Sequence, residues 1–380
     1  LEKLAAVVDE QIGVASFCGL GHTRWATHGI PSLDNAHPHS DCSGNLVVVH
    51  NGIIENYSTL RQELRARGHR FTSETDTEVL AHLIEEYLTD DLPAAVRAAL
   101  ARVDGSYAVG VLWAGAPKTL VAARNHSPLV LGVDAEASYM ASDIPALLPY
   151  TNQVIFLDDR EMAVLTPGVI TYQSVDDGRS LRKQVTTIEW NAAMAEKSGF
   201  RHFMLKEIFE QPQAIINTVS GRIVPDTGRI DLPEIGLADE VLAGIERIAL
   251  VACGTSWHAA LVAKYWLEKW AAIPVDVDIA SEFRYRRLLI NERVLVIAIS
   301  QSGETADTLA SIRLASALGA RVLTICNVVG STMTREADGV IYTHAGPEIG
   351  VASTKAFTSQ LTALFLFTLH LARVRDAAPA

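Results

Sequence analysis

The chain has 380 residues, of which 49% are hydrophobic and 20% charged, and its formal net charge is −12. This composition excludes disordered, collagen-like and coiled-coil chains, and the length predicts about two or three domains of roughly 150 residues each. The acidic balance argues against a nucleic-acid or membrane-surface binder, whose mark is a basic patch, and no apolar run reaches the roughly 18 residues of a membrane span.

The four cysteines, Cys18, Cys42, Cys253 and Cys326, are widely spaced along the chain. They form neither a CxxC pair nor a cluster with the spacing of a metal site, so no metal is expected. Such cysteine usage indicates a reducing, cytoplasmic location, and the first residues resemble neither a signal peptide nor a transit peptide. The chain begins at Leu1 in what reads as the middle of a domain.

Up to about residue 190 the chain alternates short β-branched segments with a few helices. Residues 46–52 predict a buried strand, ended by a turn at Asn51-Gly52. A helix capped by Ser58 and ending at Gly68 follows, and then a second helix over residues 77–88. Further short strands are expected over residues 107–112, 119–123, 129–133, 139–141 and 153–157. This mixture indicates a layered α+β domain over residues 1–190.

The pattern changes over residues 191–240, which we interpret as a linker with a helical lead-in over residues 206–217. From residue 241 to 380 strands and helices alternate regularly. Strands are expected over residues 248–253, 275–279, 294–300 and 321–326, and helices over residues 256–269 and 304–318. Near-continuous apolar strands between helices predict an α/β domain whose parallel sheet is covered on both faces.

Two hydroxyl-rich turns, CGTS (253–256) and SQSGET (300–305), follow strands of this expected sheet. Ligands bind at the carboxyl ends of strands in open α/β sheets. Backbone N–H groups at a helix N-terminus can hold an anion there without Lys or Arg. The alternative is that the hydroxyls merely cap helices, which is less attractive for two turns at one sheet edge. The sequence therefore predicts a site for an anionic small molecule.

The runs IALVACGTSWHAA, IASEFRY, SQSGETADT and EIGVASTKAFTSQL together resemble the first sugar-isomerase (SIS) domain of the glucosamine-6-phosphate synthase family, over residues 241–373. The resemblance implies that the phosphate and hydroxyls of fructose 6-phosphate contact Thr255, Ser256, Ser300, Gln301, Ser302 and Thr305. It also implies that Val351, Ala352 and Ser353 close this pocket. Cys253 is expected to be a small buried residue.

The first half resembles the glutaminase domain of the same family, a layered α/β/β/α fold of the N-terminal-nucleophile (class II) type. The matching runs are HTRWATHG (22–29), NAHPH (35–39), VVVHNGIIEN (47–56) and SETDTEV (73–79). In chemical terms, Arg24 can bind the α-carboxylate of glutamine as a fork, and Asp76 can pair with its α-ammonium. Asn51 and the N–H of Gly52 can form an oxyanion hole. By resemblance, the loop that closes over glutamine contains Trp25, Thr27 and His28.

Each of these residues also has a simpler interpretation. Arg24 could form a surface ion pair, and Asn51-Gly52 could be only a hairpin turn. His28, His37 and His39 could suggest a metal, but their spacing favours structural hydrogen bonds instead. Four runs in the family's order make a joint coincidence improbable.

The chain also departs from the family pattern. The family's nucleophile is a cysteine at the mature N-terminus, activated by its own α-amine, and this chain starts downstream of it. Cys18 lies inside the chain and is not expected to replace that nucleophile. The family's second SIS domain, with the acid/base residues for ring opening, is absent from the sequence as well. The polypeptide as written is therefore expected to be a fragment without glutaminase activity.

We interpret the chain as part of a glutamine-dependent aminotransferase that makes glucosamine 6-phosphate from fructose 6-phosphate, the first step toward UDP-N-acetylglucosamine. The resemblance implies no cofactor and a homodimer of the full-length protein, and neither nucleic acid nor membrane as a partner. The main rival is a non-catalytic sugar-phosphate-binding protein. A phosphoribosyl-pyrophosphate amidotransferase is disfavoured because no acidic pyrophosphate-ribose loop is visible, and an asparagine synthetase because no SGGxDS run occurs.

Overall fold

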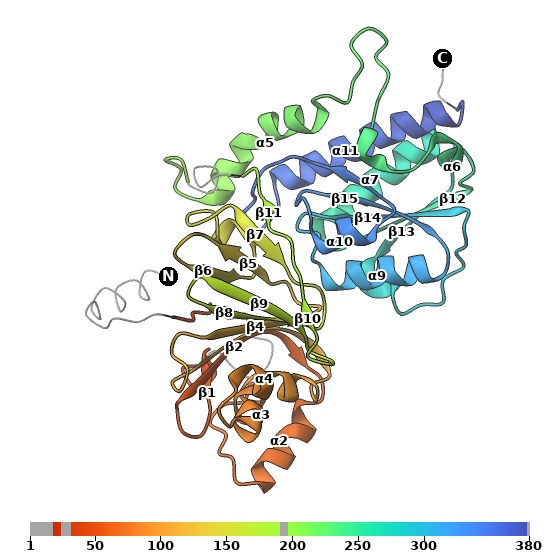
Figure 1. Cartoon of the computed structure of the whole chain (residues 1–380). Coiled ribbons are helices and arrows are strands. Elements are labelled where there is room, and N and C mark those ends of the chain that lie inside the picture. Colours follow the sequence, from red (N-terminus) through yellow and green to blue (C-terminus); the bar gives the residue numbers. More distant parts are fainter. Residues whose placement is uncertain (1–17, 24–31, 191–196, 378–380) are drawn as a thin grey trace. The chain divides into compact units, whose positions relative to one another are not determined.

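The computed structural model describes residues 18–23, 32–190 and 197–377. The chain divides into two compact units (Figure 1). The first comprises Leu1–Ser142 with Leu157–Gln184, and the second comprises Asp143–Phe156 with Val185–Ala380. None of the helices in the described part of the chain is long and apolar enough to cross a membrane.

An antiparallel sheet forms the centre of the first unit. Within the described residues its strand order is β1-β2-β3-β4-β8-β9-β10, and all neighbours are antiparallel. The strands are β1 (His39–Ser40), β2 (Leu46–Ile54), β3 (Gly105–Trp113), β4 (Leu120–Asn125), β8 (Glu161–Thr166), β9 (Val169–Ser174) and β10 (Ser180–Leu181). β2 pairs with β3 along its whole length, from Leu46 opposite Trp113 to Ile54 opposite Gly105.

Three helices cover one face of this sheet (Figure 1): α2 (Tyr57–Ala66), α3 (Glu78–Tyr87) and α4 (Leu92–Leu100). Their apolar sides share one core with the sheet. The sequence starts α4 with Asp91, whose Oδ1 accepts the N–H of Ala94 at 3.0 Å. Two shorter antiparallel strands, β5 (Val130–Val133) and β6 (Ser138–Ala141), add a further layer. Gly110 of β3 lies so close to Met140 of β6 that a Cβ there would be 2.8 Å from its sulfur.

The second unit contains a parallel sheet with the order β13-β12-β14-β15-β16 among the described residues. The strands are β12 (Arg247–Ala252), β13 (Val275–Ile279), β14 (Val294–Ser300), β15 (Arg321–Cys326) and β16 (Gly339–Tyr342). The first strand of this sheet, β12, thus lies between the second and the third. The chain leaves β12 toward one side and later returns to the other, which makes the β12–β14 boundary the topological switch point.

Helices cover both faces of the parallel sheet (Figure 1). Ile248 and Leu250 of β12 pack against α7 (Gly254–Trp270) and α11 (Lys355–Val374). The alternate residues Ala249 and Val251 share the opposite core with three further helices. Those helices are α8 (Ala280–Phe283), α9 (Ala306–Ala317) and α10 (Thr332–Glu336). Burial on both faces explains the continuous apolar strand sequences, and the predicted α/β class is confirmed.

The segment expected to be a linker contains α5 (Phe203–Val219), which packs along α11. Nζ of Lys355, at the start of α11, lies 2.7 Å from Oε2 of Glu210 in α5. The buried Glu207 accepts the N–H of Ile349 at 2.6 Å. α5 is therefore built into the second unit. The remaining elements of this unit are η1 (Ile144–Ala146), β7 (Gln153–Phe156), β11 (Thr186–Thr187), η3 (Pro233–Ile235) and α6 (Asp239–Ala243).

Two local predictions are wrong. No turn occurs at Asn51-Gly52, because β2 continues to Ile54. Gly52 has a φ of +139° and approaches β3 so closely that a Cβ would collide with the carbonyl of Ser106. The glycine therefore permits close backbone contact inside a sheet. The N-cap of α2 is Asn56 rather than Ser58, so this helix starts earlier than predicted.

Candidate functional site

Asn51 and Gly52, the predicted oxyanion-hole residues, lie near the end of β2. The side chain of Asn51 is exposed, and Gly52 is half-buried. The preceding residue, His50, is buried, with Nδ1 2.9 Å from Oγ1 of Thr77 and Nε2 3.3 Å from the carbonyl oxygen of Ser106. Burial lowers the pKa of His50, which keeps the imidazole neutral near pH 7. The strand end is thus fixed by neutral hydrogen bonds while Asn51 remains open to solvent.

Asp76, the predicted partner of the glutamine ammonium, lies beside the same strand end. Its carboxylate is buried, and Oδ2 accepts the backbone N–H of Ile54 at 2.9 Å. Asn51, Gly52 and Asp76 are therefore held by a single strand, although Asp76 comes from the segment before α3. A rigid strand provides the fixed placement that binding and oxyanion donors need.

The other predicted motifs in this unit are joined by histidine–hydroxyl contacts. Nε2 of His37 lies 3.1 Å from Oγ1 of Thr77, and Nε2 of His39 lies 3.0 Å from Oγ1 of Thr75. The structural hydrogen bonds expected for His37 and His39 are confirmed. Thr75, Thr77 and His50 were not singled out from the sequence, although they lie inside the matching runs. The described residues do not include Arg24, Trp25, Thr27 and His28.

Cys18 lies in a different environment. It is half-buried and lines a cavity of about 400 Å³ in the first unit, together with Lys118, Glu136 and Tyr139. Burial raises the pKa of the Cys18 thiol. An activated nucleophile needs a lowered pKa, because the thiolate is the reactive form. The environment of Cys18 therefore agrees with the expectation that it is not the nucleophile.

The two hydroxyl-rich turns lie side by side at the switch point of the parallel sheet. Ala252, the last residue of β12, is opposite Ile299 of β14. In the second turn, Oγ of Ser300 lies 3.1 Å from Oγ1 of Thr305 and accepts the N–H of Gly303 at 3.0 Å. Two hydroxyls of this turn, those of Ser300 and Thr305, thus meet directly before α9.

The second hydroxyl-rich turn contacts the end of β15 and the segment that follows this strand. Gly303 has a φ of +69°, and a Cβ there would lie 2.7 Å from Sγ of Cys326. The carboxylate of Glu304 accepts the N–H of Thr332 at 2.7 Å and its hydroxyl at 3.0 Å. The half-buried Gln301 accepts the N–H of Asn327 through its carbonyl at 3.2 Å. These contacts fix the backbone of the turn.

The alternative interpretation is that the hydroxyl groups of the two turns cap helices. The N-cap residues of α7 and α9 do not support it. Thr305 is the N-cap residue of α9, but its side chain makes no capping hydrogen bond. The N-cap of α7 is Cys253, which makes none either. Thr255 and Ser256 lie within the first turn of α7, the former exposed and the latter buried.

The third group of predicted sugar-phosphate residues lies apart from the turns in sequence. Val351, Ala352 and Ser353 follow β16 and precede α11, and the side chain of Val351 is 94% exposed. The hydroxyl of Ser353 donates to Oε2 of the buried Glu348 at 2.9 Å. This carboxylate also accepts the N–H of Thr354 at 2.8 Å, so it organises the start of α11.

Comparisons with known proteins agree with both halves. A family model described as a glutamine amidotransferase domain matches residues 22–149, and one described as an SIS domain matches residues 241–370. The glutamine–fructose-6-phosphate aminotransferase [isomerizing] of Caldanaerobacter subterraneus subsp. tengcongensis is 53% identical over 354 residues, which are 93% of this chain and 58% of the relative. The enzyme of that name from Symbiobacterium thermophilum is 53% identical over 353 residues, with the same coverage.

Among solved structures, the C-terminal domain of glucosamine-fructose-6-phosphate aminotransferase from Francisella tularensis is 47% identical, with a TM-score of 0.46. The match covers 48% of this chain and 52% of that one. The chain spans about 58% of the length of the curated relatives above. The amidotransferase match contains the β2 residues and Asp76, and the SIS match contains both hydroxyl-rich turns. In its two domains and along nearly all of its length, the chain belongs to the family of the glutamine–fructose-6-phosphate aminotransferases.

Proposed function

We propose that this chain is part of an enzyme that makes glucosamine 6-phosphate from fructose 6-phosphate and glutamine. The observation that carries the proposal is the pair of hydroxyl-rich turns at the switch point of the parallel sheet. A phosphate ester fits this place, because the N-terminus of α9 favours an anion and the turn offers several donors. The names of the relatives support fructose 6-phosphate as that ester.

In the sugar-phosphate half, Ser300, Ser302 and Thr305 donate to the phosphate oxygens, and Gln301 orients the ester. Thr255 and Ser256, in the neighbouring first turn of α7, bind the phosphate or the sugar hydroxyls from the other side of the switch point. Val351, Ala352 and Ser353 close the pocket. The phosphate is held by neutral donors, since neither turn contains Lys or Arg.

In the glutamine half, Asp76 pairs with the α-ammonium, and Arg24 holds the α-carboxylate. The amide of Asn51 and the N–H of Gly52 stabilise the oxyanion that forms when a thiolate attacks the side-chain amide. The segment with Trp25, Thr27 and His28 covers the bound glutamine. We assign the attacking thiolate to none of the four cysteines of this chain. Hydrolysis releases ammonia, which the whole protein transfers to the sugar before isomerisation.

The proposal extends to the organisation of the whole protein. We assign residues 1–190 to the glutaminase domain, residues 191–240 to a helical lead-in and residues 241–380 to the first SIS domain. The whole protein is a cytoplasmic homodimer that needs no organic cofactor. Its widely spaced cysteines support a reducing compartment.

The test measures binding of fructose 6-phosphate to the chain by calorimetry. It also measures the unfolding temperature of the chain with and without this ligand. Binding and a raised unfolding temperature are expected with fructose 6-phosphate, and neither with fructose. The double variant Ser302→Ala/Thr305→Ala should lose both effects, and Ser331→Ala, behind the turn, serves as the folding control. Equal binding to the wild type and the double variant would contradict the proposed site. Binding without formation of glucosamine 6-phosphate by the whole protein would favour the non-catalytic sugar-phosphate-binding alternative.

A further inference from the structure

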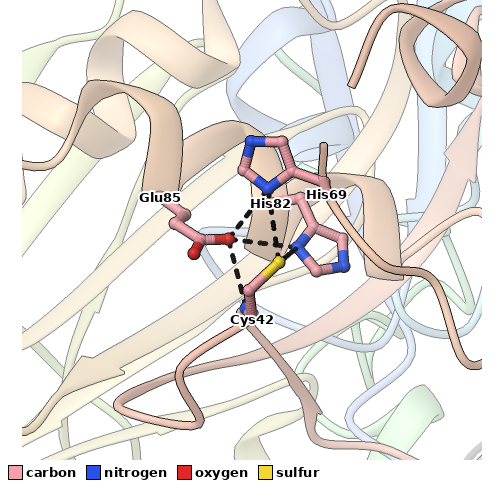
Figure 2. Close-up of side chains that lie close together, drawn as sticks. All are labelled: Cys42, His69, His82 and Glu85. Atoms are coloured by element: carbon pink, nitrogen blue, oxygen red, sulfur yellow. Dashed lines mark hydrogen bonds and ion pairs between the residues drawn. The ribbon is translucent and has the colours of Figure 1, made fainter. Parts of the chain in front are cut away.

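Four side chains of the first unit converge at its surface, apart from the residues assigned to glutamine: Cys42, His69, His82 and Glu85 (Figure 2). One ligand atom of each lies within 4.8 Å of all the others. His82 is buried, His69 and Glu85 are half-buried, and Cys42 is exposed, so the cluster is accessible from solvent. Figure 2 shows the thiol, both imidazoles and the carboxylate pointing toward one another.

Three separate segments position these side chains. Cys42 lies in the connection between β1 and β2, where Oδ1 of Asp41 accepts the N–H of Leu46 at 3.0 Å. His69 follows α2 directly after Gly68, whose φ of +100° ends the helix. His82 and Glu85 lie three positions apart on α3, and this spacing places them on one side of the helix.

The distances between the facing atoms match the edges of a tetrahedral zinc site. Sγ of Cys42 lies 3.5 Å from Nδ1 of His69 and 3.5 Å from Nδ1 of His82. Oε2 of Glu85 lies 3.0 Å and 3.2 Å from the same two nitrogens. Tetrahedral bonds of ordinary zinc lengths give edges of about 3.5 Å between sulfur and nitrogen and about 3.3 Å between nitrogen and oxygen. Four of the six edges are therefore close to those of a site for one small cation, and all six are within 4.8 Å.

The ring nitrogens that face away from the cluster, Nε2 of His69 and Nε2 of His82, also lie near carboxylates. Nε2 of His69 lies 2.8 Å from Oε1 of Glu86, and Nε2 of His82 lies 3.8 Å from Oε1 of Glu78. Histidines that bind a metal commonly direct the other ring N–H at a carboxylate, which fixes the tautomer and the ring orientation. His69 thus has a hydrogen-bonded carboxylate on the side away from the cluster, whereas the carboxylate beside Nε2 of His82 lies beyond hydrogen-bond distance.

We infer that the first unit binds one zinc ion through Sγ of Cys42, Nδ1 of His69, Nδ1 of His82 and Oε2 of Glu85. On binding, the thiol of Cys42 releases its proton to solvent, and the thiolate and carboxylate balance the two charges of the ion. A mixed sulfur, nitrogen and oxygen set suits zinc better than magnesium or calcium, which prefer oxygen alone. Four protein ligands fill the tetrahedron, so the site is structural rather than catalytic. It ties the β1–β2 connection to the C-terminal ends of α2 and α3.

Metal content is the first test, measured on the whole chain prepared without a histidine tag. After removal of metals with EDTA, the protein is dialysed against Zn²⁺ with excess Mg²⁺, and bound zinc is counted by mass spectrometry. One zinc per chain is expected. Cobalt substitution should give the absorption of tetrahedral Co²⁺ with a thiolate charge-transfer band. Less than one-tenth of an ion per wild-type chain, or cobalt spectra without the thiolate band, would overturn the inference.

Two variants and two controls locate the site. Cys42→Ser, an exposed and nearly isosteric change, should abolish the thiolate band and lower the zinc content. Glu86→Gln leaves all four ligands in place and should weaken zinc affinity about 10- to 100-fold, as outer-shell changes do. Cys18→Ser and His126→Ala remove a thiol and an exposed imidazole elsewhere and should retain one zinc. If Cys42→Ser does not fold, the zinc affinity of Glu86→Gln is the deciding measurement. An unchanged zinc affinity of Glu86→Gln would contradict the assignment.

Discussion

The carboxylate of Asp76 accepts the backbone N–H of Ile54 at 2.9 Å, and so joins the segment before α3 to the end of β2. The same carboxylate is assigned to the ammonium of glutamine, so one side chain has a structural and a binding role. The two roles are separable, because an amide oxygen can replace the carboxylate as acceptor but carries no charge.

The variant Asp76→Asn should therefore keep most of its stability and lose affinity for glutamine. A hydrogen bond to a charged group contributes about 1.5–3 kcal/mol, so KM for glutamine in the whole protein should rise at least about tenfold. Glutamate release gives KM, and thermal unfolding gives stability. Asp104→Asn, an exposed carboxylate in the same unit, is the matched control. An unchanged KM would remove Asp76 from the glutamine site.

Asn51→Ala tests the oxyanion hole. Loss of one such donor costs about 10²- to 10³-fold in rate, and the exposed position of Asn51 makes a large stability loss unexpected. Glutamine hydrolysis by the whole protein should fall by that factor, whereas amination of the sugar with added ammonium salt should remain unchanged. Equal losses in both assays would mean that Asn51 acts on the fold instead of the reaction.

Gly52→Ala should destabilise the first unit more than Gly44→Ala. Both glycines have a positive φ, but a Cβ at position 52 would collide with the carbonyl of Ser106, whereas nothing lies within 4 Å of one at position 44. Backbone strain alone costs on the order of 1 kcal/mol, and the collision adds to it at position 52. Urea unfolding of the two variants measures the difference. Equal losses would show that β2 and β3 can separate without cost.

The pair formed by Asp159 and Arg124 predicts an acid-sensitive contribution to stability. Burial raises the pKa of Asp159, but His126 and Arg124 outweigh that effect and hold the pKa below its ordinary value. A carboxyl with a lowered folded-state pKa stabilises the protein above the unfolded-state pKa, about 3.9, and this contribution disappears as the pH falls through the folded-state pKa.

The variant Asp159→Asn should lose about 2 kcal/mol at pH 7, because it removes a charged hydrogen-bond partner of the buried Arg124. The difference from the wild type should begin to shrink below about pH 4, where Asp159 of the unfolded wild-type chain gains a proton, and should disappear as the pH falls through the lowered pKa of the folded state. Chemical unfolding between pH 7 and pH 2 measures both values. Asp90→Asn, an exposed position, should show no such trend. A pH-independent difference would mean that the charge of Asp159 is not what stabilises the unit.

Removal of zinc should lower the stability of the first unit. A ligand that binds only the folded state stabilises it by about 4 kcal/mol at a thousandfold excess over its Kd. The unfolding temperature of the wild type should therefore be higher with zinc than with EDTA. In Cys42→Ser the two conditions should nearly coincide. A zinc effect of equal size in that variant would place the stabilising ion elsewhere.

The sequence predicted the second unit better than the first. β13, β14 and β15 begin and end where the sequence predicted, because strands buried on both faces are continuous apolar runs between polar turns. The hydroxyl-rich turns could be placed at one sheet edge for the same reason. The first unit is antiparallel, and contacts between strands override local signals there. Asn51-Gly52 reads as a turn, but its conformation is set by Ser106 in the neighbouring strand.

The Cys42 cluster could not be found from spacing. Cys42 lies 27 positions before His69 and 40 before His82, and no recurrent metal motif has these intervals. Only the packing of α2 and α3 beside the β1–β2 connection brings the three segments together. The hydrogen-bonding histidines were easier to interpret, because the spacing of His37 and His39 within one short run matches no recurrent metal motif.

The absence of Lys and Arg from both hydroxyl-rich turns means that the proposed site would recognise a phosphate ester through neutral donors. Neutral donors act only over short distances, so they give no long-range attraction that ions in solution could screen. A chain with a net charge of −12 repels polyanions at a distance. Association of a small phosphate ester with the proposed site would then be governed by diffusion and by shape at contact. Affinity should accordingly not fall as the ionic strength rises, which separates this kind of recognition from the salt-sensitive binding of phosphates by basic patches.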